Sequence, residues 1–200
     1  ALAEPENMQR NYIIETDGTP ISEALLDELK ISNEARSLGA GQSPYGNELW
    51  YAMPLTKSAM KEIKAQPYVK KVRFLDVEES NPMDSLLTYP IGVKKSWTHN
   101  DYGPLWIPKK GATLNLTLQK LPYYIRCIKN YEGNEVDVKG GKIYINGKEA
   151  KTYTFKMDYY WMMGDNRDNS SDSRYWGFVP EDHIIGTPMF VIISFDPDKP

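Results

Sequence analysis

The side chains most able to do chemistry in this 200-residue chain lie between Gly164 and Pro180. This segment reads GDNRDNSSDSRYWGFVP, and carboxylates, guanidinium groups, amides and hydroxyls follow one another in it without an apolar interruption from Asp165 to Arg174. Arginine and carboxylate side chains can pair through two parallel hydrogen bonds, so these charges can order the segment. In an extended strand, Asp172 and Arg174 would lie on one face. We therefore predict a direct, partly buried ion pair between Asp172 and Arg174.

Aromatic residues border this polar segment on both sides, at 159–163 and at 175–178. Short apolar runs of this kind predict buried strands, which would hold the polar segment between them. On composition alone, an exposed turn rich in Asn, Asp and Ser is the alternative. A calcium-binding loop of the EF-hand type is excluded. That loop needs glycine at its sixth position and glutamate at its twelfth, whereas counting from Asp165 gives Ser170 and Trp176.

Strands and helices alternate in the first part of the chain. Residues 11–16, 48–55 and 69–77 have the composition of strands. Thr19 can cap a first helix with Pro20 in its first turn, and Thr56 can cap a second helix that runs to about Ala65. The apolar residues of the first helix recur at helical spacing: Ile21, Leu25 and Leu29. The order strand, helix, strand, helix, strand predicts a small α/β unit over residues 10–78.

From Trp106 onward the pattern is that of β-structure. Apolar and polar residues alternate over 113–118, and the same alternation recurs around the glycine turns at 140–141 and 146–147. We predict one sheet system that includes the strand at 159–163 and a closing strand near Ile192. Its inward-facing residues would be Leu114, Leu116, Ile143 and Ile145.

The predicted fold class is mainly β with a small inserted α/β unit, or α+β overall. We expect an inserted α/β subdomain at 1–78, a connecting segment at 79–105, and a β domain at 106–200 that carries the polar segment.

The block GDNRDNSSDSR followed by YWGFVP resembles the last signature block of the bacterial type I signal peptidases. These are membrane-anchored serine endopeptidases that use a Ser-Lys dyad to remove signal sequences from exported proteins. The resemblance covers about residues 106–190 and is strong from Tyr159 to Gly186. It implies a signal-peptidase-like β fold, signal peptides of exported preproteins as substrates, and no cofactor. It also implies a membrane-associated location on the extracytoplasmic (periplasmic) face.

By this resemblance, Ser170 would form a hydrogen bond near the catalytic lysine, and the ion pair of Asp172 with Arg174 would brace the site. Four further residues would shape the loop: Gly164, Asp165, Asn166 and Arg167. All of these are supporting residues.

The nucleophile and the base of the dyad are not found in the sequence. The dipeptides Ser-Met and Lys-Arg and the tripeptide Pro-Gly-Asp, which mark the family's catalytic blocks, do not occur in it. The segment from Trp106 to Lys148 resembles a degenerate copy of those blocks, in which the lysine position falls on Arg126 and Glu132-Gly133-Asn134 replaces Pro-Gly-Asp. The alternative is a coincidence, because hairpins of unrelated proteins share such turn patterns. Arginine stays charged at any useful pH and cannot act as a general base. We expect the chain to be the carboxy-terminal, extracytoplasmic part of a relative, without membrane anchor or dyad, and inactive by itself.

Other candidate chemistry is weak. Ser58 and Lys61 form a Ser-x-x-Lys pair at a helix start, as in penicillin-binding proteins, but no Lys-Thr-Gly follows. His99 and His183 are isolated histidines, more typical of surface or hydrogen-bonded structural positions than of ligands. Zinc has no ligand cluster, and the single cysteine, Cys127, cannot form an internal disulfide.

The formal net charge of −3 offers no basis for binding nucleic acid. Two alternatives to a part of a protease stay open at this point. One is a catalytically dead homologue that binds exported chains or a partner protease, and the other is a plain β structural module.

Overall fold

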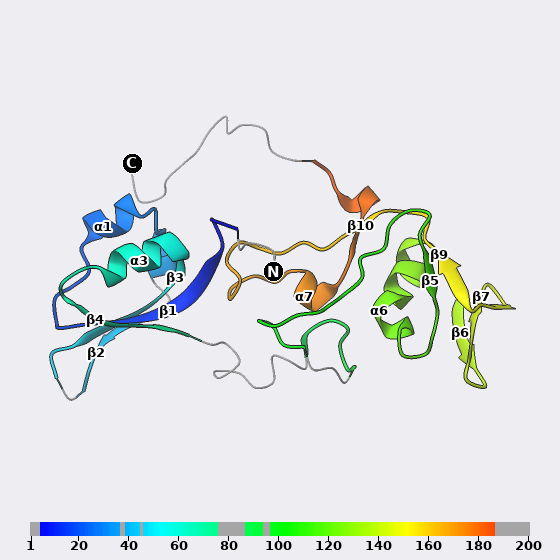
Figure 1. Ribbon diagram of the computed structural model, residues 1–200, viewed down its shortest axis with the longest axis horizontal. Coiled ribbons are helices and arrows are strands. Elements are labelled where there is room, and N and C mark those ends of the chain that lie inside the picture. Colours follow the sequence, from blue (N-terminus) through cyan, green and yellow to red (C-terminus); the bar gives the residue numbers. More distant parts are fainter. Residues whose placement is uncertain (1–4, 37–38, 45, 76–86, 94–96, 187–200) are drawn as a thin grey trace. The chain divides into compact units, whose positions relative to one another are not determined.

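The computed structural model describes residues 5–36, 39–44, 46–75, 87–93 and 97–186 (Figure 1). Antiparallel sheets dominate it and short helices accompany them, so the predicted α+β, mainly β class is confirmed. The chain divides into two compact units. One comprises residues 1–104 and 162–177, and the other comprises 105–161 and 178–200. Within the described part of the chain, none of the helices is long and apolar enough to cross a bilayer.

A four-stranded antiparallel sheet forms the centre of the first unit. Its strand order is β2-β3-β1-β4, and the strands are β1 (Gln9–Thr16), β2 (Gly39–Gln42), β3 (Leu49–Thr56) and β4 (Val69–Phe74). The helices α1 (Glu23–Glu28) and α3 (Lys57–Lys64) pack on one face of this sheet (Figure 1). The core between them consists of Ile14, Ile21, Leu26, Ile31, Met53, Leu55, Ala59 and Ile63.

The helix starts in this unit differ in how well they were predicted. Thr56 caps α3 as expected, because its side chain accepts a hydrogen bond from the backbone N–H of Ala59. The predicted cap at Thr19 is wrong, since Ser22 caps α1 through Leu25 N–H. Asp17 explains the difference: its Oδ1 accepts from Thr19 N–H at 2.9 Å and holds Thr19 in a turn. A short helix, α2 (Asn33–Arg36), and β2 were not predicted.

The second unit contains three small sheets. β5 (Thr113–Asn115) pairs with β9 (Thr152–Thr154), and β10 (Tyr159–Tyr160) pairs with β11 (Val179–Pro180). The third sheet has the order β6-β7-β8, and its strands are β6 (Val136–Lys139), β7 (Lys142–Ile145) and β8 (Lys148–Glu149). The expectation of one sheet system is therefore wrong for the described residues. The predicted closing strand near Ile192 lies outside them.

A helix interrupts the predicted β pattern of this unit. α6 (Leu121–Arg126) continues into a π-helix, η1 (Cys127–Tyr131), and a 3-10 turn, η2 (Glu181–His183), follows β11. Pro122 lies in the first turn of α6, a position that helices tolerate. Buried residues of α6 and η1 recur three or four positions apart, which is helical spacing: Leu121, Tyr124, Cys127 and Ile128. The prediction of continuous β-structure is wrong for residues 121–131, because it overlooked the helical spacing of these apolar residues.

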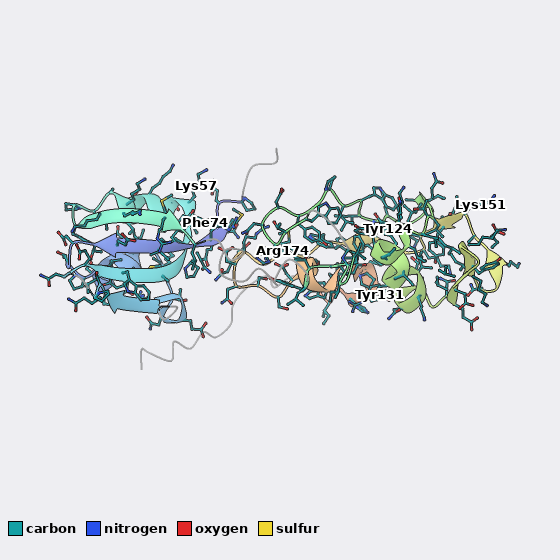
Figure 2. The ribbon with its side chains drawn as sticks, turned by 90° about the horizontal axis from the view of Figure 1, so that it is seen from below. Lys57, Phe74, Tyr124, Tyr131, Lys151 and Arg174 are labelled. Atoms are coloured by element: carbon teal, nitrogen blue, oxygen red, sulfur yellow. The ribbon has the colours of Figure 1, made fainter. Side chains whose placement is uncertain are left out.

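Aromatic rings fill the core of the second unit. The Tyr124 ring, labelled in Figure 2, stacks on the Phe178 ring with centroids 5.7 Å apart. Phe155 is 1% exposed and contacts the rings of Tyr124 and Tyr159 edge-on. Leu114, Leu116 and Ile143 are buried as predicted, and Ile145 is half-buried. The aromatic run at 159–163 is buried only in part, because Tyr160 is 41% and Met162 is 39% exposed.

Candidate functional site

The ion pair of Asp172 with Arg174 is the centre of the polar segment. Arg174 donates from Nη2 to Asp172 Oδ2 at 2.8 Å and from Nε to Asp172 Oδ1 at 2.9 Å, the bidentate arrangement (Figure 2 labels Arg174). The side chains of Arg174 and Asp172 are only 1% and 5% exposed. The predicted pair is therefore present, and it is more deeply buried than predicted.

The backbone that brings these two residues together is not the predicted extended strand. Asp172 is the N-cap of a short helix, α7 (Ser173–Trp176), and its Oδ1 accepts from Arg174 N–H at 3.1 Å. Asp172 Oδ2 also accepts from Gly164 N–H at 3.1 Å. One carboxylate thus joins the first residue of the loop to its closing helix, so the loop is fastened at both ends.

Hydrogen bonding decides the charge state of Asp172. Burial by itself raises the pKa of a carboxyl. At Asp172 the hydrogen bonds from the Arg174 side chain and backbone and from Gly164 N–H outweigh burial, so the pKa is lowered below its usual range. The Asp172 carboxylate is therefore held ionised beside the guanidinium.

His99 is a member of this site to which the sequence assigned no part. It is 2% exposed, and its Nε2 lies 2.8 Å from Arg174 Nη1 and 2.7 Å from the carbonyl oxygen of Arg167. Its Nδ1 lies 2.6 Å from the hydroxyl of Tyr175. The structure therefore places His99 among the hydrogen-bonded structural histidines. A signal that could have pointed to it is the density of aromatic and polar residues around it in SWTHNDYGP.

The other two carboxylates of the segment bind the start of β1. Asp168 has a fully buried side chain, accepts from Arg10 Nε at 3.1 Å and accepts from Asn11 N–H at 2.5 Å. Asp165 accepts from Asn7 Nδ2 at 2.5 Å. The segment is therefore not ordered by its own charges alone, because Arg10, far away in sequence, pairs with Asp168.

Backbone bonds continue this contact with β1. Gln9 N–H donates to Asp165 O at 2.7 Å, and Arg167 N–H donates to Gln9 O at 3.0 Å, so that Gln9 and Asn166 form a parallel bridge. The Arg167 side chain donates from Nη1 to Met163 Sδ at 3.3 Å, while its Nε is buried without a partner among the described residues. The loop therefore pairs with the first residue of β1 through backbone hydrogen bonds.

Gly164 and Ser170 are in close contact across the loop. A β-carbon placed on Gly164 would come within 2.8 Å of Ser170 Cβ, so glycine is required there by space and not by backbone conformation. Ser170 lies at an open hollow of about 490 Å³, lined also by Asp168, Asn169, Ser171 and Tyr175. The loop therefore packs Ser170 closely against Gly164 at the side of this hollow.

The segment that contains Arg126 has a different character. Arg126 ends α6, and its guanidinium carbon lies 5.5 Å from the ring centroid of Tyr131, which Figure 2 labels. The following Glu132 is held by the hydroxyl of Tyr153 at 2.5 Å and by the hydroxyl of Tyr159 at 3.1 Å. Asn134 donates to Tyr153 Oη at 2.8 Å. Glu132 and Asn134 are thus part of a structural hydrogen-bond network.

The Ser-x-x-Lys pair lies in the first turns of α3. Ser58 Oγ is 3.0 Å from Thr56 Oγ1, the cap of that helix, and both Ser58 and Lys61 are exposed. They line a groove of about 1050 Å³ in the first unit, together with Tyr12, Met60 and other residues. No group of three or more His, Cys, Asp or Glu that could bind a metal occurs among the residues that the structure describes.

Comparison with known proteins points to a class of peptidase. The family described as "Signal peptidase, peptidase S26" matches residues 151–193, which include β10, the polar segment and α7. The comparison with solved structures finds no match.

Curated relatives agree with this family. The chain is similar to Signal peptidase I of Buchnera aphidicola subsp. Acyrthosiphon pisum (60% identical over 48 residues, 24% of this chain and 15% of that protein). It is similar to Signal peptidase I of Helicobacter pylori strain J99 (41% over 63 residues, 32% of this chain and 22% of that protein). A third relative is Signal peptidase I of Leptolyngbya laminosa (37% over 76 residues, 32% of this chain and 37% of that protein).

The resemblance to the type I signal peptidase family is therefore confirmed, and the part of the chain around residues 151–193 carries it. The matches span between 15% and 37% of the length of these three relatives.

Proposed function

We propose that this chain is the supporting part of a type I signal peptidase, a serine endopeptidase that removes signal peptides from exported proteins. In this proposal a serine and a lysine outside these 200 residues form the catalytic dyad, and the chain holds the loop that braces them. The enzyme acts on preproteins at the extracytoplasmic face of the membrane, to which an anchor outside this sequence attaches it. The boundaries 1–78, 79–105 and 106–200 remain our proposal for its domains.

The observation that supports this proposal best is the buried ion pair of Asp172 with Arg174 together with the close packing of Ser170 on Gly164. A Ser-Lys protease needs a lysine that is neutral before it can take the proton of the serine. A hydroxyl held in a fixed place can accept or donate a hydrogen bond to that lysine and so orient it. Ser170 has this role in the proposal, Asp172 and Arg174 brace it, and the turn at 164–167 gives the loop its shape.

Two measurements test the proposal. The chain as given should show no cleavage of a preprotein, whereas the complete reading frame, with Ser-Met and Lys-Arg blocks, should cleave it. In that complete protein, Ser170→Ala should lower kcat about tenfold or more while the melting temperature stays unchanged. Ser171→Ala is the matched control, because Ser171 is an exposed neighbour whose backbone carbonyl accepts from Trp176 Nε1, while its hydroxyl has no recorded bond to the described residues. Equal activity of the two variants would contradict the role of Ser170.

The same assay tests the Ser-x-x-Lys pair. If the chain as given cleaves a preprotein and Ser58→Ala abolishes that cleavage, Ser58 is the nucleophile and the proposal is wrong.

A catalytically dead homologue is the second candidate, and Arg126 favours it. The guanidinium of Arg126 lies over the Tyr131 ring at the position where the resemblance expects a lysine, and an arginine at this position cannot act as a base. Such a homologue would bind exported chains or a partner protease. Absence of the Ser-Met and Lys-Arg blocks from the complete reading frame, together with preprotein binding by the chain, would select this candidate.

A further inference from the structure

Arg174 has a complete set of hydrogen-bond acceptors. A guanidinium group carries five N–H donors. In this structure Nε donates to Asp172 Oδ1, Nη2 donates to Asp172 Oδ2 and to Arg167 O, and Nη1 points to His99 Nε2 at 2.8 Å and His99 O at 3.3 Å. These five acceptors match the five donors one to one. The match holds only if His99 Nε2 is an acceptor.

The imidazole of His99 cannot satisfy both of its Nε2 neighbours. If Nε2 carried a proton, it would donate to Arg167 O at 2.7 Å, and one N–H of Arg174 would be left without an acceptor. The Arg174 side chain is only 1% exposed, so solvent cannot replace that acceptor, and an unpaired buried donor is unfavourable. Arg167 O, in contrast, already accepts from Arg174 Nη2 at 2.5 Å, so an Nε2 without a proton leaves no buried donor unpaired, although its 2.7 Å contact with this oxygen is then one between two acceptors.

We propose that His99 is a positioning residue held as the tautomer protonated at Nδ1, with Nε2 accepting from Arg174. The Nδ1–H then donates to the Tyr175 hydroxyl oxygen, 2.6 Å away. One ring thereby bonds two residues of α7, Arg174 and Tyr175, and Arg174 in turn holds the backbone of the loop by donating to Arg167 O. His99 fixes the direction of the guanidinium, and through Asp172 it fixes the end of the loop on which Ser170 lies.

The tautomer of His99 can be measured whether or not the protein cleaves preproteins. The role of His99 in positioning Ser170 for cleavage, in contrast, rests on the proposed function. An experiment can therefore refute the tautomer or the catalytic role without refuting the other. An inactive complete protein would remove the catalytic role and leave the tautomer measurable on this chain.

Nitrogen NMR of the ring measures the tautomer directly. The chain has two histidines, so His183→Gln in a ¹⁵N-histidine-labelled sample leaves His99 as the single signal. We expect an acceptor-type shift for Nε2 and a protonated-type shift for Nδ1. The opposite pattern, or protonated-type shifts at both nitrogens, overturns the proposal.

Two substitutions of His99 distinguish the roles of its two ring nitrogens. The amide of glutamine can put an oxygen near the Nε2 position, whereas the shorter asparagine can replace only the Nδ1 donor. We expect His99→Gln to keep the Arg174 Nη1 hydrogens, which point to position 99, protected from exchange with solvent. His99→Asn should lower that protection about tenfold or more, as the loss of one hydrogen bond from a charged group implies.

The Ser170 amide signal reports on the loop in the same spectra. We expect it to shift in His99→Asn and to stay close to that of the parent chain in His99→Gln. Equal behaviour of the two variants, in exchange and in the Ser170 signal, would overturn the assignment of Nε2 as the positioning atom. In the complete enzyme His99→Gln should keep kcat and His99→Asn should lower it at unchanged KM. Cleavage unchanged in both variants, with the NMR result as expected, would overturn only the catalytic role.

Discussion

A β-carbon placed on Gly164 would lie 2.2 Å from the hydroxyl oxygen of Ser170, closer than two non-bonded atoms can approach. Ser170 therefore leaves no room for a side chain at position 164. Because Gly164 N–H also donates to Asp172, neither residue can move without disturbing the buried ion pair.

Gly164→Ala should destabilise the chain by about 1–3 kcal/mol, because the added methyl group overpacks the contact with Ser170. The free energy of unfolding in urea measures this. Adding Ser170→Gly in the same chain should restore most of the loss, since it removes the colliding atoms. Gly186→Ala is the control: Gly186 has open space at its β-carbon, and the change should stay within about 0.5 kcal/mol. A double variant no more stable than Gly164→Ala would contradict the contact.

Arg174→Ala should cost about 3–5 kcal/mol, because it leaves the Asp172 carboxylate buried without its partner. Arg167→Ala should cost about 1 kcal/mol or less, because Arg167 donates only to Met163 Sδ and its Nε has no partner among the described residues. Denaturant melts of the two variants give the comparison. Small and equal effects would mean that the ion pair contributes little to the fold.

Acid should remove the contribution of the same ion pair. The pKa of Asp172 is lowered in the folded chain, so the unfolded chain binds its proton at a higher pH. The stabilisation is complete above the ordinary aspartate pKa of about 3.9 and is lost as the pH falls from there through the lowered folded pKa. Asp172→Asn should therefore be much less stable than the parent at pH 7, and the difference should shrink below about pH 4. A difference in unfolding free energy that stays constant from pH 7 to pH 2 would disprove this linkage.

Cys127 should be unreactive in the folded chain. Its thiol is fully buried. Burial is the main cause that raises the pKa of this thiol well above its ordinary value, and the nearby Glu132 raises it further. We expect thiol reagents at pH 7 to modify it slowly in buffer and rapidly in 6 M guanidinium chloride. Modification in buffer at the rate of the unfolded chain would show that the core of the second unit opens.

Local patterns in the sequence were sufficient for the features that depend on neighbours in the chain. The pairing of Asp172 with Arg174, the cap at Thr56 and the burial of Leu114 and Ile143 each involve residues a few positions apart or one strand period. The helix α6 could have been found in the same way from the spacing of its buried residues, but the glycine and asparagine turns beyond it favoured a β interpretation.

Partners far apart in sequence could not be predicted. Nothing in the composition around Arg10 indicates that its guanidinium binds Asp168, 158 positions further along. The burial of His99 beside Arg174 is likewise set by tertiary packing, since isolated histidines occur on surfaces as often as inside. Such pairings follow from the topology of the chain, and a single sequence carries no direct signal of them.

The contact of residues 7–11 with residues 165–168 also bears on how the protein is made. The partners in it are up to 158 positions apart, so Asp165 and Asp168 leave the ribosome long after Asn7 and Arg10. At about 5–20 residues per second, that interval is roughly 10–30 s. During this time the start of β1 at Gln9, which β4 does not reach, lacks the loop as its second neighbour, and unpaired strand segments can pair with other chains. The polar segment can therefore bind β1 only after the residues between Arg10 and Asp168 have been made, and the start of β1 must still be unpaired on that side.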